Sequence, residues 1–286
     1  MKKQLFFTLA LFAFTGVLFS QPGGIEYGSN IEAGKYIEVD GINLYYETYG
    51  EGTPLLLLHG GLGSISAFTS SIPALSEQYQ VIAADSPGHG RSEQPEELTY
   101  HSMAHAFSTL IDRLGLDSVY VMGWSDGGVI ALILAADRPD KVKKVIAVGA
   151  NTTLDGLTED VVKYITVEMA NFVKNNPTKA DAEQHYGWWT ASYFRLSPAP
   201  EKWKSILEKV QKMWATEIYI PQEQLEKISI PTMIVQGDRD EIKLTHTEEI
   251  FRAIKNSQLC ILPNTSHLVF DERPGLMCRI AVEFFE

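Results

Sequence analysis

The first candidate for a catalytic residue is Ser125. This serine lies in the stretch Gly-Trp-Ser-Asp-Gly-Gly, residues 123–128, which follows the apolar run 119–122 and opens a helix-like run. The pattern predicts a strand, a sharp turn and a helix, with the serine held at the turn as a nucleophile. Gly123 and Gly127, two residues either side of the serine, suit a strained and crowded turn in which larger side chains would clash.

An acid and a base for such a nucleophile follow later in the chain. The apolar, β-branched run 231–236 has the pattern of a buried parallel strand, and it ends in Gly-Asp-Arg-Asp, which contains Asp240. A second such run, 258–262, ends in a loop that carries His267. Both side chains therefore come directly after predicted core strands, where they could serve as an orienting acid and a general base.

A glycine-rich loop precedes the serine. The apolar run 55–58 leads into His-Gly-Gly-Leu-Gly, residues 59–63. A backbone with so few side chains can direct its N–H groups at a developing oxyanion. We expect the backbone N–H groups of Gly61 and Asp126 to be these donors.

In this combination the chain resembles the α/β-hydrolase superfamily, from about residue 35 to the C-terminus. The turn Asp-Ser-Pro-Gly-His-Gly-Arg-Ser, residues 85–92, resembles the family's turn after its fourth strand, and the order Ser125, Asp240, His267 matches the family's triad. Within the superfamily, the serine motif and the later Val-Gly-Ala-Asn are most similar to the biphenyl hydrolase-like esterases, whose known member cleaves amino-acid esters. The resemblance implies a serine hydrolase with an acyl-enzyme intermediate.

Four residues are candidates for contact with substrate. The resemblance to amino-acid ester hydrolases implies that the Asp126 carboxylate pairs with a cationic α-amino group, but the same side chain could instead belong to a hydrogen-bond network near the turn or face solvent. Trp124 is either a pocket wall or a packing residue. Trp188 and Trp189 belong to an aromatic-rich stretch that could line an acyl or alcohol pocket or join two parts of the molecule.

Several side chains compete for the catalytic roles. Asp238 lies two residues before Asp240, and the family spacing of glycine and acid favours Asp240. Asp155 follows the sixth predicted strand, an alternative acid position in some relatives, but Asn151 occupies the turn there. His246 is on the predicted helix after the acid and is a poor candidate for the base.

The remaining histidines are interpreted as structural. His59 belongs to the oxyanion loop and His89 to a turn, while His101 and His105 have helical spacing on a predicted surface helix without further ligands nearby. We expect no metal site and no cofactor, because protein groups and water complete the mechanism.

The reaction predicted is hydrolysis of small carboxylic esters, including α-amino-acid esters. The runner-up is hydrolysis of a carbon–carbon bond in 2-hydroxy-6-oxo-dienoate ring-fission products, and enol-lactone hydrolysis and perhydrolase chemistry use the same serine. Haloalkane dehalogenases and soluble epoxide hydrolases need an aspartate where Ser125 stands. A non-catalytic binding protein of this fold is disfavoured, because such proteins usually lose a triad residue.

The strand signals predict an α/β fold of the α/β-hydrolase type, with an eight-stranded, mostly parallel sheet. A turn at Asp40 and Gly41 predicts that the first two strands form an antiparallel hairpin. Amphipathic stretches predict helices on both faces of the sheet, at 101–114, 243–254 and 273–285. The predicted strands are 36–39, 44–48, 55–58, 81–84, 119–122, 145–148, 233–236 and 259–262.

One stretch interrupts the alternation of predicted strands and helices. Residues 151–227 have no strong buried-strand signal, contain helix-like runs at 159–173 and 200–214, and are rich in tryptophan and tyrosine. We interpret this stretch as a helical cap inserted after strand six, over the carboxyl ends of the strands. The hydrolase core is then 35–150 and 228–286.

The first residues predict export. Lys2 and Lys3 precede an apolar run, 5–19, which is shorter than a membrane-spanning helix needs. We expect a signal peptide at 1–20, a linker at 21–34, and a periplasmic or secreted enzyme with no stable membrane association after cleavage; an uncleaved anchor is the alternative that the sequence leaves open.

The net charge limits the classes of partner, and the two cysteines raise the question of a disulfide. The formal net charge of −12 disfavours nucleic acid and anionic membranes, so a small-molecule ester is the expected partner. Export would allow Cys260 and Cys278 to oxidise, but buried free thiols are the more common state of two cysteines in a large domain. The oligomeric state is left open by the sequence.

Overall fold

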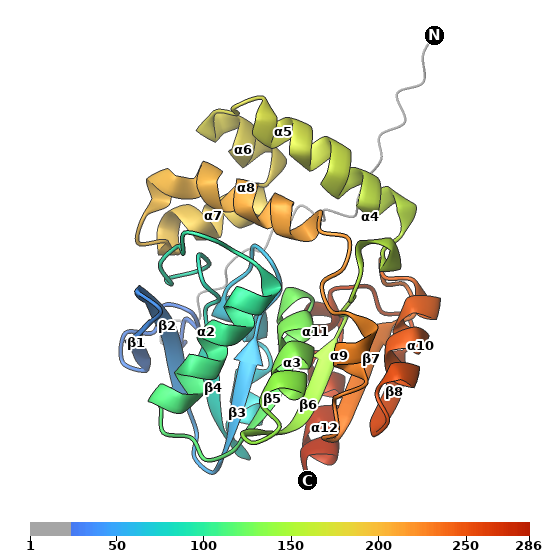
Figure 1. Ribbon diagram of the computed structural model, residues 1–286. Coiled ribbons are helices and arrows are strands. Elements are labelled where there is room, and N and C mark those ends of the chain that lie inside the picture. The colour runs from blue at the N-terminus through green and yellow to red at the C-terminus, as the bar shows by residue number, and fades with distance from the viewer. Residues whose placement is uncertain (1–23) are drawn as a thin grey trace.

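The computed structural model describes residues 24–286 and contains a central sheet of eight strands in the order β1-β2-β4-β3-β5-β6-β7-β8 (Figure 1). β1 pairs antiparallel with β2, β2 pairs antiparallel with β4, and every later pair is parallel. The predicted mostly parallel, eight-stranded sheet is confirmed. The strands are β1 Gly34–Val39, β2 Ile42–Tyr49, β3 Thr53–Leu58, β4 Tyr79–Ala84, β5 Val119–Trp124, β6 Val142–Val148, β7 Thr232–Gly237 and β8 Ser257–Leu262.

The predicted hairpin joins β1 and β2. Asp40 and Gly41 have φ angles of 51° and 82°, so both central residues of the turn are left-handed. Such a turn matches the right-handed twist of paired strands, and aspartate and glycine tolerate it best.

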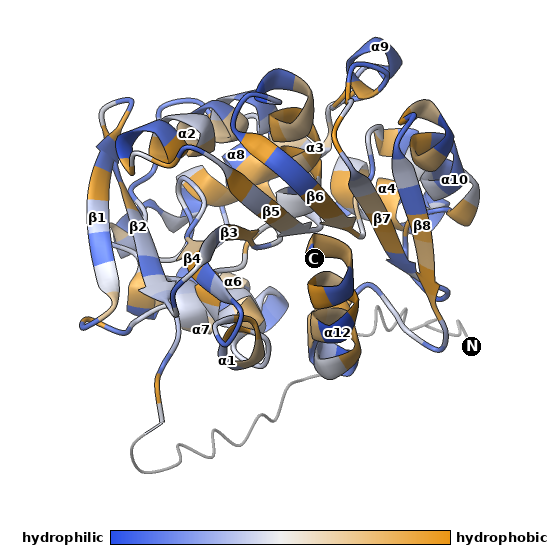
Figure 2. Ribbon diagram, turned by 90° about the horizontal axis from the view of Figure 1, so that it is seen from below, coloured by the Kyte–Doolittle hydropathy of each residue, from blue (hydrophilic) through white to orange (hydrophobic). Residues whose placement is uncertain are grey.

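Helices cover both faces of the sheet, as Figure 2 shows from below. Leu56 and Leu58 of β3 pack in the core on the side of α2 and α3, whereas Leu55 and Leu57 pack on the side of α1 and α12. This division follows from the alternation of side chains along a strand. The core helices are α1 Ile72–Leu75, α2 Tyr100–Arg113, α3 Asp126–Asp137, α10 Leu244–Ala253, α11 Val269–Glu272 and α12 Pro274–Phe285, with the 3-10 helix η1 Ile65–Phe68.

In the helical insertion after β6, the helices α4 to α8 lie above the carboxyl ends of the strands (Figure 1), whereas the last one, α9, packs against α3 and α10 beside the sheet. The predicted cap after strand six is thereby confirmed as part of the fold, while the domain boundaries remain predictions. A π-helical segment joins α4 to α5, so the predicted helix 159–173 is one run with a widened turn in its middle. The inserted elements are η2 Leu154–Gly156, α4 Glu159–Lys163, η3 Tyr164–Met169, α5 Ala170–Lys174, α6 Lys179–His185, α7 Gly187–Leu196, η4 Pro200–Lys202, α8 Trp203–Trp214 and α9 Gln222–Leu225.

The start of the described chain is held against β2. The backbone N–H groups of Gly28 and Asn30 each donate to the buried carboxylate of Glu47, both at 2.8 Å. The predicted signal peptide lies outside the described residues. Among residues 24–286 no helix is both long and apolar enough to cross a membrane. Cys260 and Cys278 are free thiols.

Candidate active site

Ser125 stands on a strained turn between β5 and α3. Its backbone has φ 56° and ψ −120°, a conformation that residues other than glycine rarely adopt. A Cβ atom on Gly123 would lie 2.0 Å from the carbonyl oxygen of Gly127, and one on Gly127 would lie 2.1 Å from that of Leu58. The two glycines therefore allow the backbone to fold closely enough to present the serine.

Of the three predicted triad residues, His267 lies within hydrogen-bond distance of both Ser125 and Asp240. His267 Nε2 is 2.9 Å from Ser125 Oγ, and His267 Nδ1 is 2.9 Å from Asp240 Oδ1. A neutral imidazole with its proton on Nδ1 donates to Asp240 and accepts from the serine hydroxyl. The side chain of Asp240 is fully buried, whereas that of His267 is 24% exposed. This arrangement can pass a proton from the serine to the histidine.

The surroundings of His267 favour its protonated form. Burial by itself lowers the pKa of His267, but the charge of Asp240, its hydrogen bond and the charges of Glu241 and Asp126 outweigh burial. The net result is a pKa above the ordinary value of 6.5. Asp240 therefore makes His267 a stronger base for the serine proton.

The glycine-rich loop after β3 lies against the nucleophile. A Cβ atom on Gly60 would be 3.0 Å from Ser125 Cβ, and one on Gly61 would be 2.3 Å from Asp126 Oδ2. Gly61 therefore lies beside the residue that follows the serine. The contact is with the Asp126 side chain, and the assignment of the two backbone N–H groups as oxyanion donors stays a prediction.

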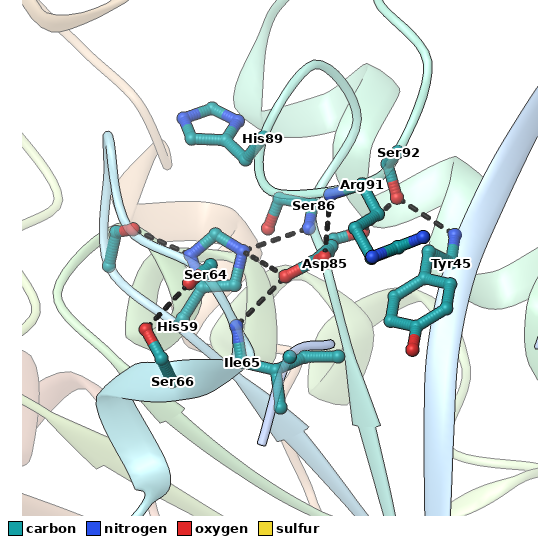
Figure 3. A network of polar contacts seen from close by, with 12 residues as sticks. Tyr45, His59, Ser64, Ile65, Ser66, Asp85, Ser86, His89, Arg91 and Ser92 are labelled. Atoms are coloured by element: carbon teal, nitrogen blue, oxygen red, sulfur yellow. Dashed lines mark hydrogen bonds and ion pairs between the residues drawn. The ribbon is translucent and has the colours of Figure 1, made fainter. Parts of the chain in front are cut away.

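Hydrogen bonds of His59 and Asp85 connect this loop to its neighbours, as the close view in Figure 3 shows. His59 Nδ1 lies 2.7 Å from the carbonyl oxygen of Gly60, and His59 Nε2 accepts from the N–H of Ser86 at 2.9 Å. The buried Asp85 carboxylate accepts the N–H groups of Ile65 and Arg91, both at 2.8 Å. The loop after β3 is thus tied to the loop after β4.

Burial keeps His59 neutral. Burial and, to a smaller extent, the neighbouring His89 together lower the pKa of His59 to about 3, against the opposing effect of the hydrogen bond to Gly60. A neutral ring can donate from Nδ1 and accept at Nε2 together, which is what its two contacts require. The interpretation of His59 as part of the oxyanion loop agrees with these contacts.

The Asp126 carboxylate lies in a buried hydrogen-bond network. Tyr100 donates its hydroxyl to Oδ1 at 2.8 Å, and Trp214 Nε1 lies 3.1 Å from Oδ1 and 2.9 Å from Oδ2. Burial raises the pKa of Asp126, while the hydrogen bonds from Trp214 and Tyr100 oppose the rise. The sequence left open whether the Asp126 side chain faces substrate, solvent or a hydrogen-bond network near the turn. In the structure it is part of such a network.

The tryptophans predicted to contact substrate have different surroundings. Trp124 donates its indole N–H to the carbonyl oxygen of His267 at 2.8 Å, so it supports the loop that carries the base. Trp188 is 49% exposed on α7. Trp189 is 2% exposed and packs against Tyr193, with ring centroids 5.1 Å apart. In the described residues, no hydrogen bond or ring contact joins Trp188 or Trp189 to the triad.

The rival residues have other partners. Asp238 Oδ1 accepts the N–H of Thr265, and the buried His246 accepts the N–H of Thr152 through Nε2. His105 lies on α2 near Asp40. Residues 24–286 contain no cluster of histidine, cysteine or carboxylate side chains that could hold a metal ion.

Sequence reasoning missed Tyr100 and placed Trp214 only among the aromatic residues of the cap. Tyr100 is the first residue of α2, and the capping pattern of Thr99 and Ser102 could have located the start of that helix but not the direction of the tyrosine. Trp214 ends α8, and its contact with Asp126 joins residues 88 positions apart. No local signal in the sequence encodes such a contact.

Known proteins resemble this chain over most of its length. Residues 53–274 match the family described as alpha/beta hydrolase fold, so the chain belongs to that family and is a hydrolase of the α/β type. A relative from Homo sapiens, Serine hydrolase BPHL, is 29% identical over 90% of this chain and 85% of its own. Proline iminopeptidase from Saccharolobus solfataricus is 26% identical over 91% of this chain and 94% of its own.

Solved structures share the fold. The meta-cleavage product hydrolase from Pseudomonas fluorescens IP01 is 26% identical, with a TM-score of 0.71 over 90% of this chain and 98% of that one. The predicted resemblance to the α/β-hydrolase superfamily is confirmed, and similarity to a biphenyl hydrolase-like protein is present.

Proposed function

We propose that this protein hydrolyses carboxylic esters of small molecules through an acyl-enzyme on Ser125. The observation that carries the proposal is the continuous hydrogen-bonded arrangement of Ser125, His267 and Asp240, with Ser125 held on a strained turn. A serine hydroxyl is a weak nucleophile unless an adjacent base can take its proton. His267 is that base, and Asp240 orients it and stabilises its charged form.

The reaction proceeds in two acyl transfers. Ser125 Oγ bonds to the ester carbonyl carbon, its proton passes to His267 Nε2, and the carbonyl electrons form an oxyanion that the N–H groups of Gly61 and Asp126 stabilise. His267 then gives the proton to the leaving alcohol as the C–O bond breaks. Water repeats the same steps on the acyl-enzyme, releasing the acid and restoring the serine.

We further propose that α-amino-acid esters are preferred substrates. Tyr100 and Trp214 supply two donors to Asp126, and a carboxylate can accept about four hydrogen bonds, so the group has capacity for a substrate ammonium. Burial makes an unpaired negative charge costly, and a cation would offset that cost. The similarity to Serine hydrolase BPHL supports the serine hydrolase chemistry on which this substrate proposal rests.

The alternatives are carbon–carbon cleavage, as in the meta-cleavage product hydrolase, enol-lactone hydrolysis, and peptide-bond cleavage, as in proline iminopeptidase. Ring-fission dienoates are anionic, and the Asp126 carboxylate beside the oxyanion loop would repel them. We therefore place them second. We also propose that the enzyme is exported, from the pattern of residues 1–20.

A substrate panel with Asp126→Asn tests the preference. Asparagine keeps an oxygen that can accept from Tyr100 and Trp214 but removes the charge. We expect KM for phenylalanine and valine benzyl esters to rise about tenfold or more, because a lost charge-assisted contact costs roughly 1.5–3 kcal/mol. KM for p-nitrophenyl butyrate should stay within about twofold, as that ester has no ammonium group to lose.

The panel also includes proline p-nitroanilide and a ring-fission dienoate, each repeated with Ser125→Ala as the control for background hydrolysis. Equal losses on charged and neutral esters would contradict the role of Asp126 in amine binding. Turnover of the dienoate or the anilide alone would move the substrate class to one of the alternatives.

A further inference from the structure

Trp214 contacts both residues that are proposed to stabilise the oxyanion. Its indole N–H bonds to the two carboxylate oxygens of Asp126, at 3.1 and 2.9 Å. A Cβ atom on Gly61 would lie 2.5 Å from Trp214 Cζ2. The edge of the indole ring therefore lies directly against Gly61. Trp214 is the last residue of α8, so the contact comes from the helical insertion and not from the sheet core.

Two tyrosines, Tyr100 and Tyr219, also contact Asp126 and Trp214. Tyr100 of α2 donates to Asp126 Oδ1 at 2.8 Å, on the core side of the carboxylate. The ring of Tyr219 lies 4.7 Å from that of Tyr100, and its hydroxyl donates to the carbonyl oxygen of Trp214. Tyr100, Tyr219 and Asp126 are all buried. Asp126 is thus held between a donor from the core and a donor from the insertion.

Oxyanion stabilisation depends on the position of its donors. An oxyanion hole works when its N–H groups lie about 2.7–3.1 Å from the developing charge, so small displacements are costly. Gly61 is in a loop with three glycines, which gives the backbone unusual freedom unless neighbours restrict it. The indole ring against Gly61 and the hydrogen bonds to Asp126 supply such a restriction at both donors.

We propose that Trp214 is a positioning residue for the oxyanion hole, with Tyr100 as its counterpart on the core side. This inference rests on the proposed serine hydrolase function and goes beyond it, because it makes the rate of acyl transfer depend on a side chain of the inserted helices. The inserted helices then contribute to the chemical step as well as covering the site.

Two substitutions remove the donors to Asp126. Trp214→Phe keeps an aromatic ring at position 214 but removes both the N–H donor to Asp126 and the indole edge that lies against Gly61. For p-nitrophenyl butyrate we expect kcat to fall about tenfold, less than the ~10²–10³ loss of a direct oxyanion donor, with KM within about twofold. Tyr100→Phe removes the other donor and should have an effect of the same kind. Trp203→Phe, on the same helix but packed against Phe194, is the matched control and should leave kcat unchanged.

A trifluoromethyl ketone supplies a readout that a structural role would not move. Ser125 Oγ adds to the ketone carbon, its proton passes to His267, and the product is an oxyanion in the position of the tetrahedral intermediate. The inhibition constant of the ketone should rise by the same factor as kcat falls in Trp214→Phe. Thermal unfolding of each variant shows whether it folds, and Tyr100→Phe keeps the test decisive if Trp214→Phe does not.

Two results would contradict the inference. One is a change in KM or melting temperature with unchanged kcat and ketone affinity in both variants, which would make Trp214 a packing residue. The other is an equal loss in Trp203→Phe. Labelling of Ser125 by a fluorophosphonate tests the proposed function separately: a labelled wild-type protein with unaltered ketone affinity in the variants overturns the inference alone, whereas an unlabelled wild-type protein overturns both.

Discussion

The two sides of the candidate site are built from different parts of the molecule. On the proton-transfer side, Ser125, Asp240 and His267 all lie on loops that follow strands of the sheet, and the hydrogen bonds between them involve the core alone. On the oxyanion side, Gly61 and Asp126 also contact Trp214 from the insertion. Proton transfer should therefore tolerate changes in the inserted helices, while oxyanion stabilisation should not.

Loss of the nucleophile should lower kcat more than any other substitution, because it removes the covalent step that both the proton-transfer side and the oxyanion side support. Ser125→Ala should lower kcat for p-nitrophenyl butyrate by about 10⁴-fold or more. Steady-state kinetics on freshly purified variant, with the unfolding temperature as a control for folding, measures the loss. Activity within tenfold of wild type would require another nucleophile.

Asp240→Asn should break the proton-transfer side without disturbing the oxyanion side. We expect kcat to fall by about 10³–10⁴-fold, since the imidazole loses its orientation and its stabilised charged form. The affinity of a ground-state ester should change little, because no proposed binding contact is removed.

The pH dependence of kcat/KM shows whether Asp240 raises or lowers the pKa of His267. Activity requires neutral His267, and its pKa is raised above 6.5 by Asp240, Glu241 and Asp126 against the opposing effect of burial. In wild type, kcat/KM should thus fall as the pH drops through a value above 6.5. Removing the Asp240 charge lowers the pKa of His267, so the acidic limb of Asp240→Asn should move to lower pH. A limb that moved upward would contradict the assignment.

Gly61→Ala should disturb the oxyanion side selectively. The new Cβ atom would lie 2.3 Å from Asp126 Oδ2 and 2.5 Å from Trp214 Cζ2, so the loop or the indole must shift. A displaced oxyanion donor typically costs about 10²-fold in kcat. Gly187→Ala on α7, where an added Cβ meets nothing within 4 Å, is the control and should keep full activity. Equal activity of both variants would show that the loop position is unimportant.

His59→Gln should give the smallest effect, on acid stability. The unfolded state binds a proton at His59 near pH 6.5, whereas the folded state resists it until about pH 3, so wild type should lose stability as the pH falls below 6.5. Burial raises the pKa of Asp85 to about 7, which acts in the opposite direction between pH 3.8 and 7. The difference between wild type and His59→Gln isolates the histidine: melting temperature should fall less steeply with acidification in the variant. An identical slope would contradict a neutral, buried His59.

The two sides also differ in how far the sequence predicts them. The eight strands, the hairpin at Asp40 and Gly41, and the turn at Ser125 follow from local patterns of burial and glycine placement, so they could be predicted. The chain order of Ser125, Asp240 and His267 could be predicted from the resemblance to the family, and their closeness in space could be predicted because parallel strands bring their carboxyl ends to one edge of the sheet.

The contacts of the insertion could not be predicted, because no motif fixes its orientation on the core. Trp188 and Trp189 are adjacent in the sequence, yet one is 49% and the other 2% exposed. Trp214 has the same residue type and instead reaches Asp126. Which aromatic side chain meets the site depends on packing between segments far apart in the chain.

Mapping the site of fluorophosphonate modification on the folded protein by peptide mass spectrometry tests whether Ser125 is the nucleophile. We expect one adduct, on Ser125, that forms in wild type, is absent in Ser125→Ala, and forms more slowly as His267 becomes protonated at acidic pH. An adduct on another residue, or no adduct on a protein that hydrolyses esters, would contradict the assignment of Ser125 as the nucleophile.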